Sequence, residues 1–339
     1  MKKFDIDKVQ PGDILLTARK AATSKGIRLA SWGKVSHAMI CVQHSSVIDS
    51  TSNGVQSQNL QRIFLGDRDG AFVFRMRPGL DSAQLDAVIT YARAEIGTRY
   101  SLAEATRSVA GVRKPRSARQ FCSRLVARSY AHAGIGLVGD EDYCTPDALL
   151  ESPLLEEVPD AVVPASTAEV AAWCARPDPT SAMSKAHNAI LAAARAFDPA
   201  IENLQQVDQL VAGRAECDPP LSAILKKSGY LDLWKHDAAM NPWHYDLTEM
   251  NRITNDIRLA DLCAYCISTI GEEQSGGQRF VVNLAGYETR QRLTPRQYFA
   301  LQIDLYKILV ANHHQRCAVA LAWLEEYFPD DAVRFLERS

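Results

Sequence analysis

One cysteine lies where its surroundings would favour a nucleophilic thiolate. Cys122 opens the segment 122–130, in which Leu125, Val126 and Tyr130 recur at the spacing of one helix face, so a helix is predicted to begin at this cysteine. A thiol in the first helical turn lies near the positive end of the macrodipole and near unpaired N–H groups. The same N–H groups could stabilise an oxyanion. The alternative is a small buried apolar residue.

A histidine far upstream offers a general base. His37 lies at the start of the segment 35–42, whose pattern predicts a strand with both faces covered. A second strand is predicted at 46–50, and an antiparallel hairpin would bring Asp49 beside His37 to accept its Nδ1 proton. We therefore predict Cys122 as nucleophile, His37 as general base and Asp49 as the residue that orients the base.

Length and composition are those of an ordinary globular protein. The chain of 339 residues is longer than one typical domain, so two domains are expected. It is 47% hydrophobic and 23% charged, which allows a sizeable core. A net charge of −2 gives no general attraction to nucleic acid or to an anionic membrane, and no nucleic-acid partner is predicted.

The N-terminal residues carry no pattern of a cleavable signal peptide. Carboxylates at Asp5 and Asp7 interrupt any apolar segment, and no apolar run has the length of a membrane span. The eight cysteines are scattered, so reduced thiols are expected. We predict cytoplasmic synthesis without an integral membrane segment. A protein exported by a dedicated secretion machine would have the same features.

Further elements are predicted around these residues in the N-terminal half. Strands are expected at 14–17 and 71–77, and helices at 20–29, at 82–96 with Ser82 as cap, and after the cap Thr145.

Five motifs in order resemble a known family, the circularly permuted NlpC-type papain-like hydrolases. They lie at 11–16, 36–40, 47–55, 96–100 and 121–126. The chain is most similar to the YiiX-like branch, which is related to lecithin:retinol acyltransferase. In that permuted branch the histidine strand precedes the cysteine, as His37 precedes Cys122 here. The resemblance covers about residues 8–160.

The resemblance implies an α+β fold: a small antiparallel β-barrel or sheet packed on the nucleophile helix, with Cys122 and His37 meeting across the packing. The branch commonly carries Glu or another polar residue where this chain has Asp49. Asn53 or His44 could therefore take the third role instead.

Three residues are candidates for binding substrate. Tyr100 matches an aromatic position that lines the cleft in the family, although it could equally be a core ring. Ser36 could hydrogen-bond near the base, although a serine before a strand is often only solvated. Ser123 follows the nucleophile directly.

The C-terminal half has a different pattern. Prolines punctuate the stretch 158–180, and we predict a hydrolase domain at 1–176 and an all-α helical domain at 177–339. Helices are expected at 182–196, 200–211, 247–270, 295–327 and 331–336, with one strand-like insertion at 280–284.

Cysteine and histidine residues of this half could in principle bind zinc. They are Cys263, Cys266, His313, His314 and Cys317. The pattern lacks the tight knuckle of structural zinc sites, so we predict no metal and no cofactor. The aromatic residues between 230 and 245 are interpreted as packing rather than as a partner site.

The leading functional hypothesis is a cysteine peptidase or amidase that forms a thioester at Cys122. By resemblance its substrate would be a peptide, with cell-wall peptide as one candidate. The alternatives are a lipid acyltransferase or thioesterase with an acyl substrate, a delivered antibacterial effector whose helical domain binds a protein partner, and a non-catalytic binding module.

Overall fold

The computed structural model describes residues 1–18, 34–109, 118–255, 257–271 and 277–336. By its contacts the chain forms two compact units, 1–191 with 198–207, and 192–197 with 208–339. The first unit therefore includes residues beyond position 176, where we expect the hydrolase domain to end. The two-domain boundary itself stays a prediction. The helix expected at 20–29 lies outside the described residues.

The main sheet of the first unit is antiparallel throughout, with the strand order β5-β4-β3-β2-β7-β8. Its strands are β2 (Ile14–Ala18), β3 (His37–Gln43), β4 (Ser46–Thr51), β5 (Gly54–Asn59), β7 (Gly70–Met76) and β8 (Leu155–Glu157). The strands predicted near 14, 35, 46 and 71 are confirmed. A smaller sheet has the order β6 (Phe64–Leu65), β1 (Lys2–Phe4), β9 (Val162–Pro164).

In the described part of this unit the strands are accompanied by the α-helices α1 (Ser82–Ala94), α2 (Leu102–Val109), α3 (Cys122–His132), α4 (Pro146–Leu150) and α5 (Thr167–Ala175). The cap expected for α1 is wrong by one residue. Asp81, not Ser82, has the extended backbone of a cap, and it forms a reciprocal capping box with Gln84. Thr145 caps α4 as predicted, with Pro146 in its first turn.

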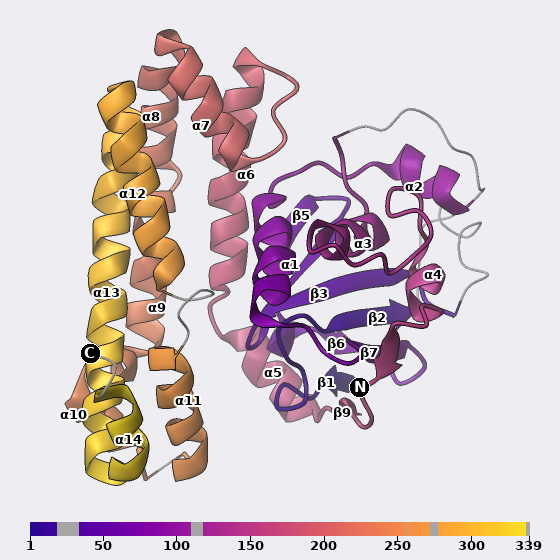
Figure 1. The fold of residues 1–339 in the computed structure, drawn as a ribbon, viewed down its shortest axis with the longest axis vertical. Helices are drawn as coiled ribbons and strands as arrows, with labels where there is room; N and C mark the ends of the chain where they lie inside the picture. The colour runs from indigo at the N-terminus through magenta and orange to yellow at the C-terminus, as the bar shows by residue number, and fades with distance from the viewer. Residues whose placement is uncertain (19–33, 110–117, 256, 272–276, 337–339) are drawn as a thin grey trace. The chain divides into compact units, whose positions relative to one another are not determined.

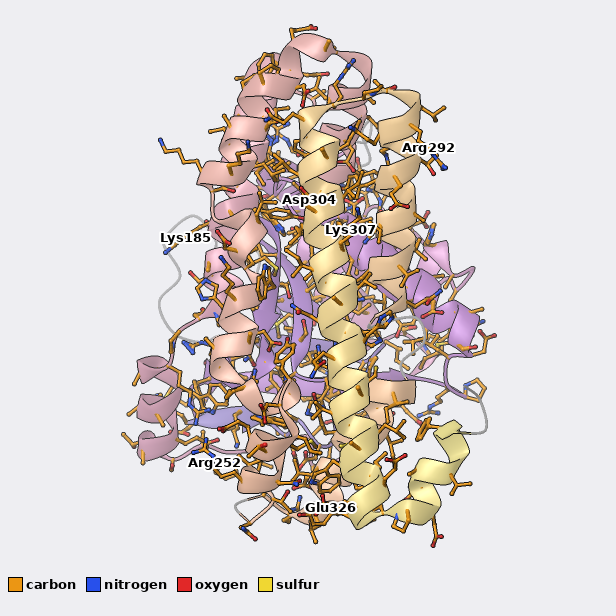
Figure 2. All side chains as sticks on the ribbon, turned by 90° about the vertical axis from the view of Figure 1, so that its left-hand side faces the viewer. Lys185, Arg252, Arg292, Asp304, Lys307 and Glu326 are labelled. Atoms are coloured by element: carbon orange, nitrogen blue, oxygen red, sulfur yellow. The ribbon has the colours of Figure 1, made fainter. Side chains whose placement is uncertain are left out.

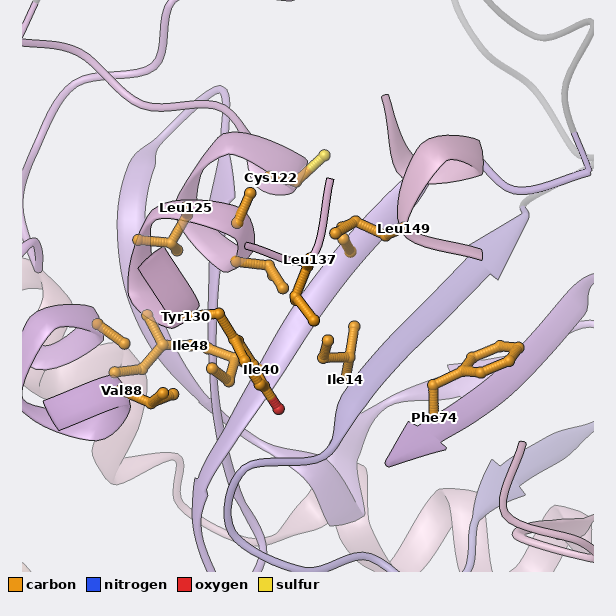
Figure 3. Packing of buried hydrophobic residues seen from close by; sticks show 14 of the residues in the cluster. Ile14, Ile40, Ile48, Phe74, Val88, Cys122, Leu125, Tyr130, Leu137 and Leu149 are labelled. Carbon is orange, nitrogen blue, oxygen red and sulfur yellow. The ribbon is translucent and has the colours of Figure 1, made fainter. Parts of the chain in front are cut away.

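The central strand β3 is covered on both faces, as its sequence predicts. Ala38, Ile40 and Val42 belong to the core that includes α1 and α3. Met39 and Cys41 belong to a second core on the opposite face. Figure 3 shows the first core, in which apolar residues of the sheet meet those of the two helices. This packing holds the start of α3 against the sheet (Figure 1).

The second unit is helical in its described part. Its helices are α8 (Asp218–Lys227), α9 (Trp234–Met240), α10 (Leu247–Ile253), α11 (Leu259–Gly271), α12 (Gln278–Leu293), α13 (Gln297–Tyr327) and α14 (Pro329–Leu336). Two further helices, α6 (Pro179–Phe197) and α7 (Leu204–Gly213), contribute residues to both units. Short 3₁₀ turns lie at Leu60–Arg62, Ala215–Cys217, Tyr230–Asp232 and Pro242–His244.

The strand predicted at 280–284 is wrong, because these residues are part of α12. Their β-branched residues favour a strand locally, but α12 packs along α13, with the ring of Phe280 near that of Tyr306, and this tertiary contact decides the structure. The helix predicted at 247–270 is interrupted between α10 and α11.

Charged residues such as Asp304 and Lys307 lie on the exposed side of α13 (Figure 2).

The predicted α+β class, followed by a helical region, is confirmed. Among the described residues, no helix is long and apolar enough to cross a lipid bilayer.

Candidate active site

Cys122 is the first residue of α3, as the sequence predicts. The capping residue Phe121 makes no side-chain cap hydrogen bond, so it leaves the first-turn N–H groups to other acceptors. The sulfur of Cys122 accepts hydrogen bonds from the backbone N–H groups of Ser123 and Ala38. The thiol is therefore held between the start of the helix and the start of β3, and the residue is only 7% exposed.

The imidazole of His37 links the thiol to a carboxylate. It hydrogen-bonds Cys122, and its Nε2 lies 2.8 Å from Oδ2 of Asp49. The expected use of Nδ1 for this contact is wrong. Asp49 pairs with Met39 across the hairpin, so it lies diagonally from His37. Such neighbours are about 7–8 Å apart at Cα, which favours the outer ring nitrogen.

Asp49 is the carboxylate at the base. It is 2% exposed, and its second oxygen, Oδ1, has no hydrogen-bond partner among the described residues. The two alternative third residues, Asn53 and His44, are exposed in the turns that follow and precede β4. Asp49 therefore has the contact with the imidazole that the third role requires.

The electrostatics favour a charged pair. Burial opposes charge on both groups and is the largest single effect on each. For His37, the hydrogen bonds to Asp49 and Cys122 outweigh burial and raise the pKa of the imidazole to about 10. For Cys122, the contact with His37 outweighs it and lowers the pKa of the thiol. Together these shifts favour a thiolate beside an imidazolium.

Tyr100 pairs with the segment that precedes Cys122. It forms an isolated parallel bridge with Gln120, two positions before Cys122. Burial, and then the negative charge of Cys122, raise the pKa of its phenol to about 12. The ring is thus near the sulfur and only half-buried, which is compatible with the predicted substrate contact.

The two serine candidates have different surroundings. Ser36 is exposed, and its hydroxyl lies 3.4 Å from the carbonyl oxygen of Thr17. The hydroxyl of Ser123 is buried and donates to the carbonyl oxygen of Cys144 at 2.9 Å. Ser123 therefore faces the nucleophile through its backbone N–H, and its side chain holds the neighbouring loop.

Polar residues missed by the sequence analysis hold the start of α3. The buried Arg124 pairs with Glu104 at 3.0 Å and donates to the carbonyl oxygens of Asp142 and Arg119. Gln120 donates to Glu95 at 2.8 Å. A charged residue on the apolar face of a predicted helix is a signal for such a role, but its partners are distant in sequence and cannot be read from a local pattern.

The candidate zinc ligands do not form a cluster. Cys317 contacts His313, with Sγ 3.4 Å from Nε2, while Cys263 lies 3.9 Å from a carboxylate oxygen of Asp331. Within the described ranges, no group of three or more His, Cys, Asp or Glu side chains is arranged to hold a metal ion.

Comparison with known proteins identifies a family match for the first part of the chain. Residues 8–174 match the family described as permuted papain-like amidase, YaeF/YiiX, C92. Over 92 residues the chain is 32% identical to the probable lipoprotein peptidase YaeF of Escherichia coli K12. The matched stretch covers 27% of this chain and 33% of that protein. A crystal structure described as the metalloprotein YiiX of Escherichia coli O157:H7 is 22% identical and covers 44% of this chain and 97% of that chain, with a TM-score of 0.36.

Proposed function

Because this chain belongs, through residues 8–174, to the permuted papain-like amidase family, we propose that it cleaves a peptide amide through a thioester at Cys122. The family match supports a papain-like hydrolase. The observation that carries the finer proposal is the continuous contact from Cys122 through His37 to Asp49. The pKa directions of the first two residues are those of a nucleophile and its acid–base partner.

The first half of the proposed reaction forms the acyl-enzyme. The thiolate of Cys122 attacks the carbonyl carbon of the amide, and negative charge develops on the carbonyl oxygen. First-turn N–H groups of α3 are the proposed donors to that oxygen, since Phe121 does not cap them with its side chain. The imidazolium of His37 then donates its proton to the leaving nitrogen, the C–N bond breaks, and a thioester remains.

The second half releases the acid. Neutral His37 takes a proton from a water molecule as that water attacks the thioester carbonyl. The C–S bond breaks and the thiolate returns with the imidazolium. Asp49 accepts a hydrogen bond from the Nε2–H group of His37 throughout, which holds the orientation of the ring.

Trapping of the acyl group tests this proposal. The purified chain would be incubated with a mixture of short peptides, and separately with cell-wall peptides, in the presence of hydroxylamine. A thioester intermediate gives peptide hydroxamates, which mass spectrometry detects together with new amino termini. We expect both products from the wild type and neither from Cys122→Ala.

Two other results would change the proposal. Cleavage that persists in Cys122→Ala would place the chemistry elsewhere. Acyl groups that appear mainly on an added alcohol or amine lipid, with little free acid, would identify an acyltransferase that uses the same pair. Cys317→Ala is a suitable control, because it removes a thiol that also contacts a histidine.

A further inference from the structure

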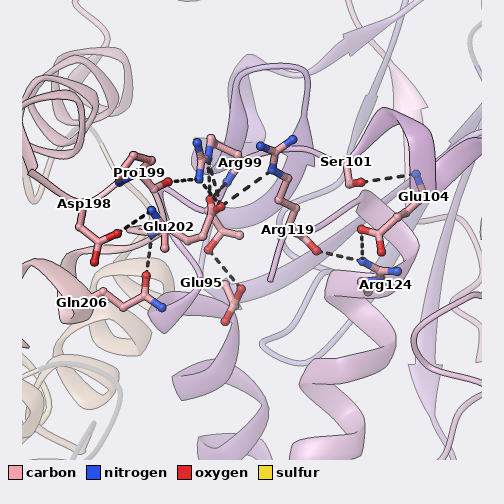
Figure 4. Close-up of polar contacts among 12 residues, drawn as sticks. Glu95, Arg99, Ser101, Glu104, Arg119, Arg124, Asp198, Pro199, Glu202 and Gln206 are labelled. Atoms are coloured by element: carbon pink, nitrogen blue, oxygen red, sulfur yellow. Dashed lines mark hydrogen bonds and ion pairs between the residues drawn. The ribbon is translucent and has the colours of Figure 1, made fainter. Parts of the chain in front are cut away.

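We propose that Glu202, which lies outside the segment that matches the family, is a positioning residue for the nucleophile. The inference rests on the proposed role of Cys122. Glu202 belongs to the short segment 198–207, which is part of the first compact unit although it lies far along the chain. Figure 4 shows its carboxylate at the centre of a polar network that extends to the start of α3.

Glu202 is bound to Arg99 by side chain and backbone together. Its carboxylate accepts from Nε of Arg99 at 3.0 Å and from Nη2 at 2.6 Å, and also from the backbone N–H of Arg99 at 3.0 Å. Arg99 donates further to the carbonyl oxygen of Pro199 at 2.7 Å. Because the contact includes the backbone N–H, it holds the main chain of Arg99 as well as its guanidinium.

The main chain at Arg99 in turn holds the residues before the nucleophile. The N–H of Gln120 donates to the carbonyl oxygen of Arg99 at 3.0 Å, and the N–H of Ser101 donates to the carbonyl oxygen of Gln120 at 2.8 Å. These two bonds flank the bridge between Tyr100 and Gln120. Only Phe121 separates Gln120 from Cys122, so Glu202 is connected to the nucleophile through a short and continuous set of contacts.

A second contact joins Glu202 to the segment that precedes Cys122. Nε of Arg119 lies 3.9 Å from the same carboxylate, and the carbonyl oxygen of Arg119 accepts from Arg124 at 3.0 Å. Glu202 therefore contacts both paired chain segments, one at Arg99 and the other at Arg119.

The segment 198–207 has its own internal order. The N–H of Glu202 donates to Oε1 of Gln206 at 2.6 Å, and the N–H of Gln206 donates to Oδ1 of Asn203 at 3.1 Å. Glu202 is only 6% exposed at its side chain, so its charge depends on Arg99 for compensation. Loss of Arg99 would leave the buried carboxylate without its closest cation, and loss of the Glu202 carboxylate would weaken the contact that holds the backbone N–H of Arg99. In both cases the backbone at Arg99 would relax.

The expected consequence is a displaced sulfur. The low pKa of Cys122 depends on its contact with His37 and on the N–H groups of Ala38 and Ser123. These contacts are short-ranged, and a displacement of about 1 Å can cost up to about 100-fold in rate. Relaxation of the segment before Cys122 should therefore raise the pKa of the thiol and lower the rate of acylation.

The test is the pH profile of Cys122 alkylation by iodoacetamide in the full chain, followed at this site by mass spectrometry. In Glu202→Gln we expect the rate at pH 6 to fall about tenfold relative to wild type. The rate at pH 10 should be unchanged, because there the thiol is ionised in both proteins. Arg99→Lys keeps the positive charge but loses the two guanidinium N–H groups that both contact the carboxylate, and it should shift the profile less.

Asp13→Asn is the matched control. Asp13 is also buried and accepts two hydrogen bonds of 2.8 Å from Arg75 in the same unit, but it lies at the start of β2. Its replacement should lower the melting temperature and leave the alkylation profile of Cys122 in place.

The possible results separate this inference from the proposed function. A depressed thiol pKa in the wild type that Glu202→Gln and Arg99→Lys leave unchanged would overturn the role of Glu202 alone. An equal shift in Asp13→Asn would overturn it too, by showing that any loss of stability moves the profile. An ordinary thiol pKa in the wild type would instead refute the role of Cys122. If Glu202→Gln does not fold, the profile of Arg99→Lys decides.

Discussion

The two compact units each contain a cysteine in contact with a histidine, and the two pairs have opposite electrostatics. In the first unit the pKa of Cys122 is lowered and that of His37 is raised. In the second unit Sγ of Cys317 lies 3.4 Å from Nε2 of His313, yet burial raises the pKa of this thiol and lowers that of the imidazole. A contact between the two side chains is therefore not sufficient for a nucleophile.

The surroundings explain the difference. Cys122 begins a helix, so first-turn N–H groups are available to its sulfur, whereas Cys317 lies well inside α13, where such groups bond to the preceding turn. His37 has the carboxylate of Asp49 at its far nitrogen. The charges that act on His313 are cationic, from Arg316 and His314, and they oppose its protonation. Position in the helix and a carboxylate partner together favour the charged form of the Cys122–His37 pair.

The largest expected effect is the loss of turnover in Cys122→Ala. Removal of the nucleophile should reduce kcat/KM on a cleavable peptide by about 10⁴-fold or more, while the melting temperature changes by only a few degrees. Cys317→Ala should keep kcat/KM within about twofold of wild type, since no step uses that thiol. Equal losses in both variants would remove the basis of the comparison.

The next effect concerns pH. The lowered pKa of Cys122 predicts that its alkylation begins at a lower pH than the pKa of about 8.5 of a free thiol, whereas Cys317 should react only above that value. On the alkaline side, kcat/KM should fall as pH passes the pKa of His37 near 10, because the proton for the leaving nitrogen is lost.

His37→Ala sharpens this prediction. It should move the alkylation profile of Cys122 to that of an ordinary thiol and reduce turnover by about 10³-fold. Site-resolved mass spectrometry reports both cysteines in one experiment. A Cys122 profile unchanged by the loss of His37 would show that the helix start alone ionises the thiol.

A smaller effect is expected from Asp49→Asn. The amide oxygen can still accept a hydrogen bond from Nε2–H, but it no longer balances the imidazolium charge, so turnover should fall by about 10- to 100-fold. The alkaline limb of the kcat/KM profile should move to lower pH, because the pKa of His37 would fall. Normal activity together with an unmoved alkaline limb would show that another residue orients the base.

The smallest expected effect concerns Asp208, a buried aspartate of the helical unit. Asp208 accepts from the hydroxyl of Tyr287 at 3.0 Å, and burial raises its pKa to about 7. Because the folded pKa lies above the unfolded value of about 3.9, its stabilising contribution is complete below that value and is lost as pH rises through 7.

Asp208→Asn should therefore raise the melting temperature by about 2 to 4 °C at pH 8, which corresponds to about 1 kcal/mol in a domain of this size, and should raise it less at pH 5. Melting curves of both proteins from pH 5 to pH 8 provide the measurement. A larger gain at pH 5 than at pH 8 would contradict the raised pKa. Peptide cleavage should not change.

Local patterns were sufficient for much of the first unit. The start of α3 at Cys122 and the strands that carry His37 and Asp49 were predicted, because apolar periodicity and turn residues act over a few positions. The same reasoning failed at 280–284, where β-branched residues form part of α12. There the packing against α13 outweighs a local preference of small energy.

Residue type and local spacing limit which residues could supply a nucleophile, a base and a carboxylate, so these candidates can be read from the amino-acid sequence. The folded chain adds that Nε2 of His37 pairs with Asp49, that Glu202 contacts Arg99, and that burial raises the pKa of the Cys317 thiol. Each of these depends on contacts between residues distant in sequence, or on burial. Hydrogen bonding and solvation, which set a pKa, are properties of the folded chain and not of any short segment.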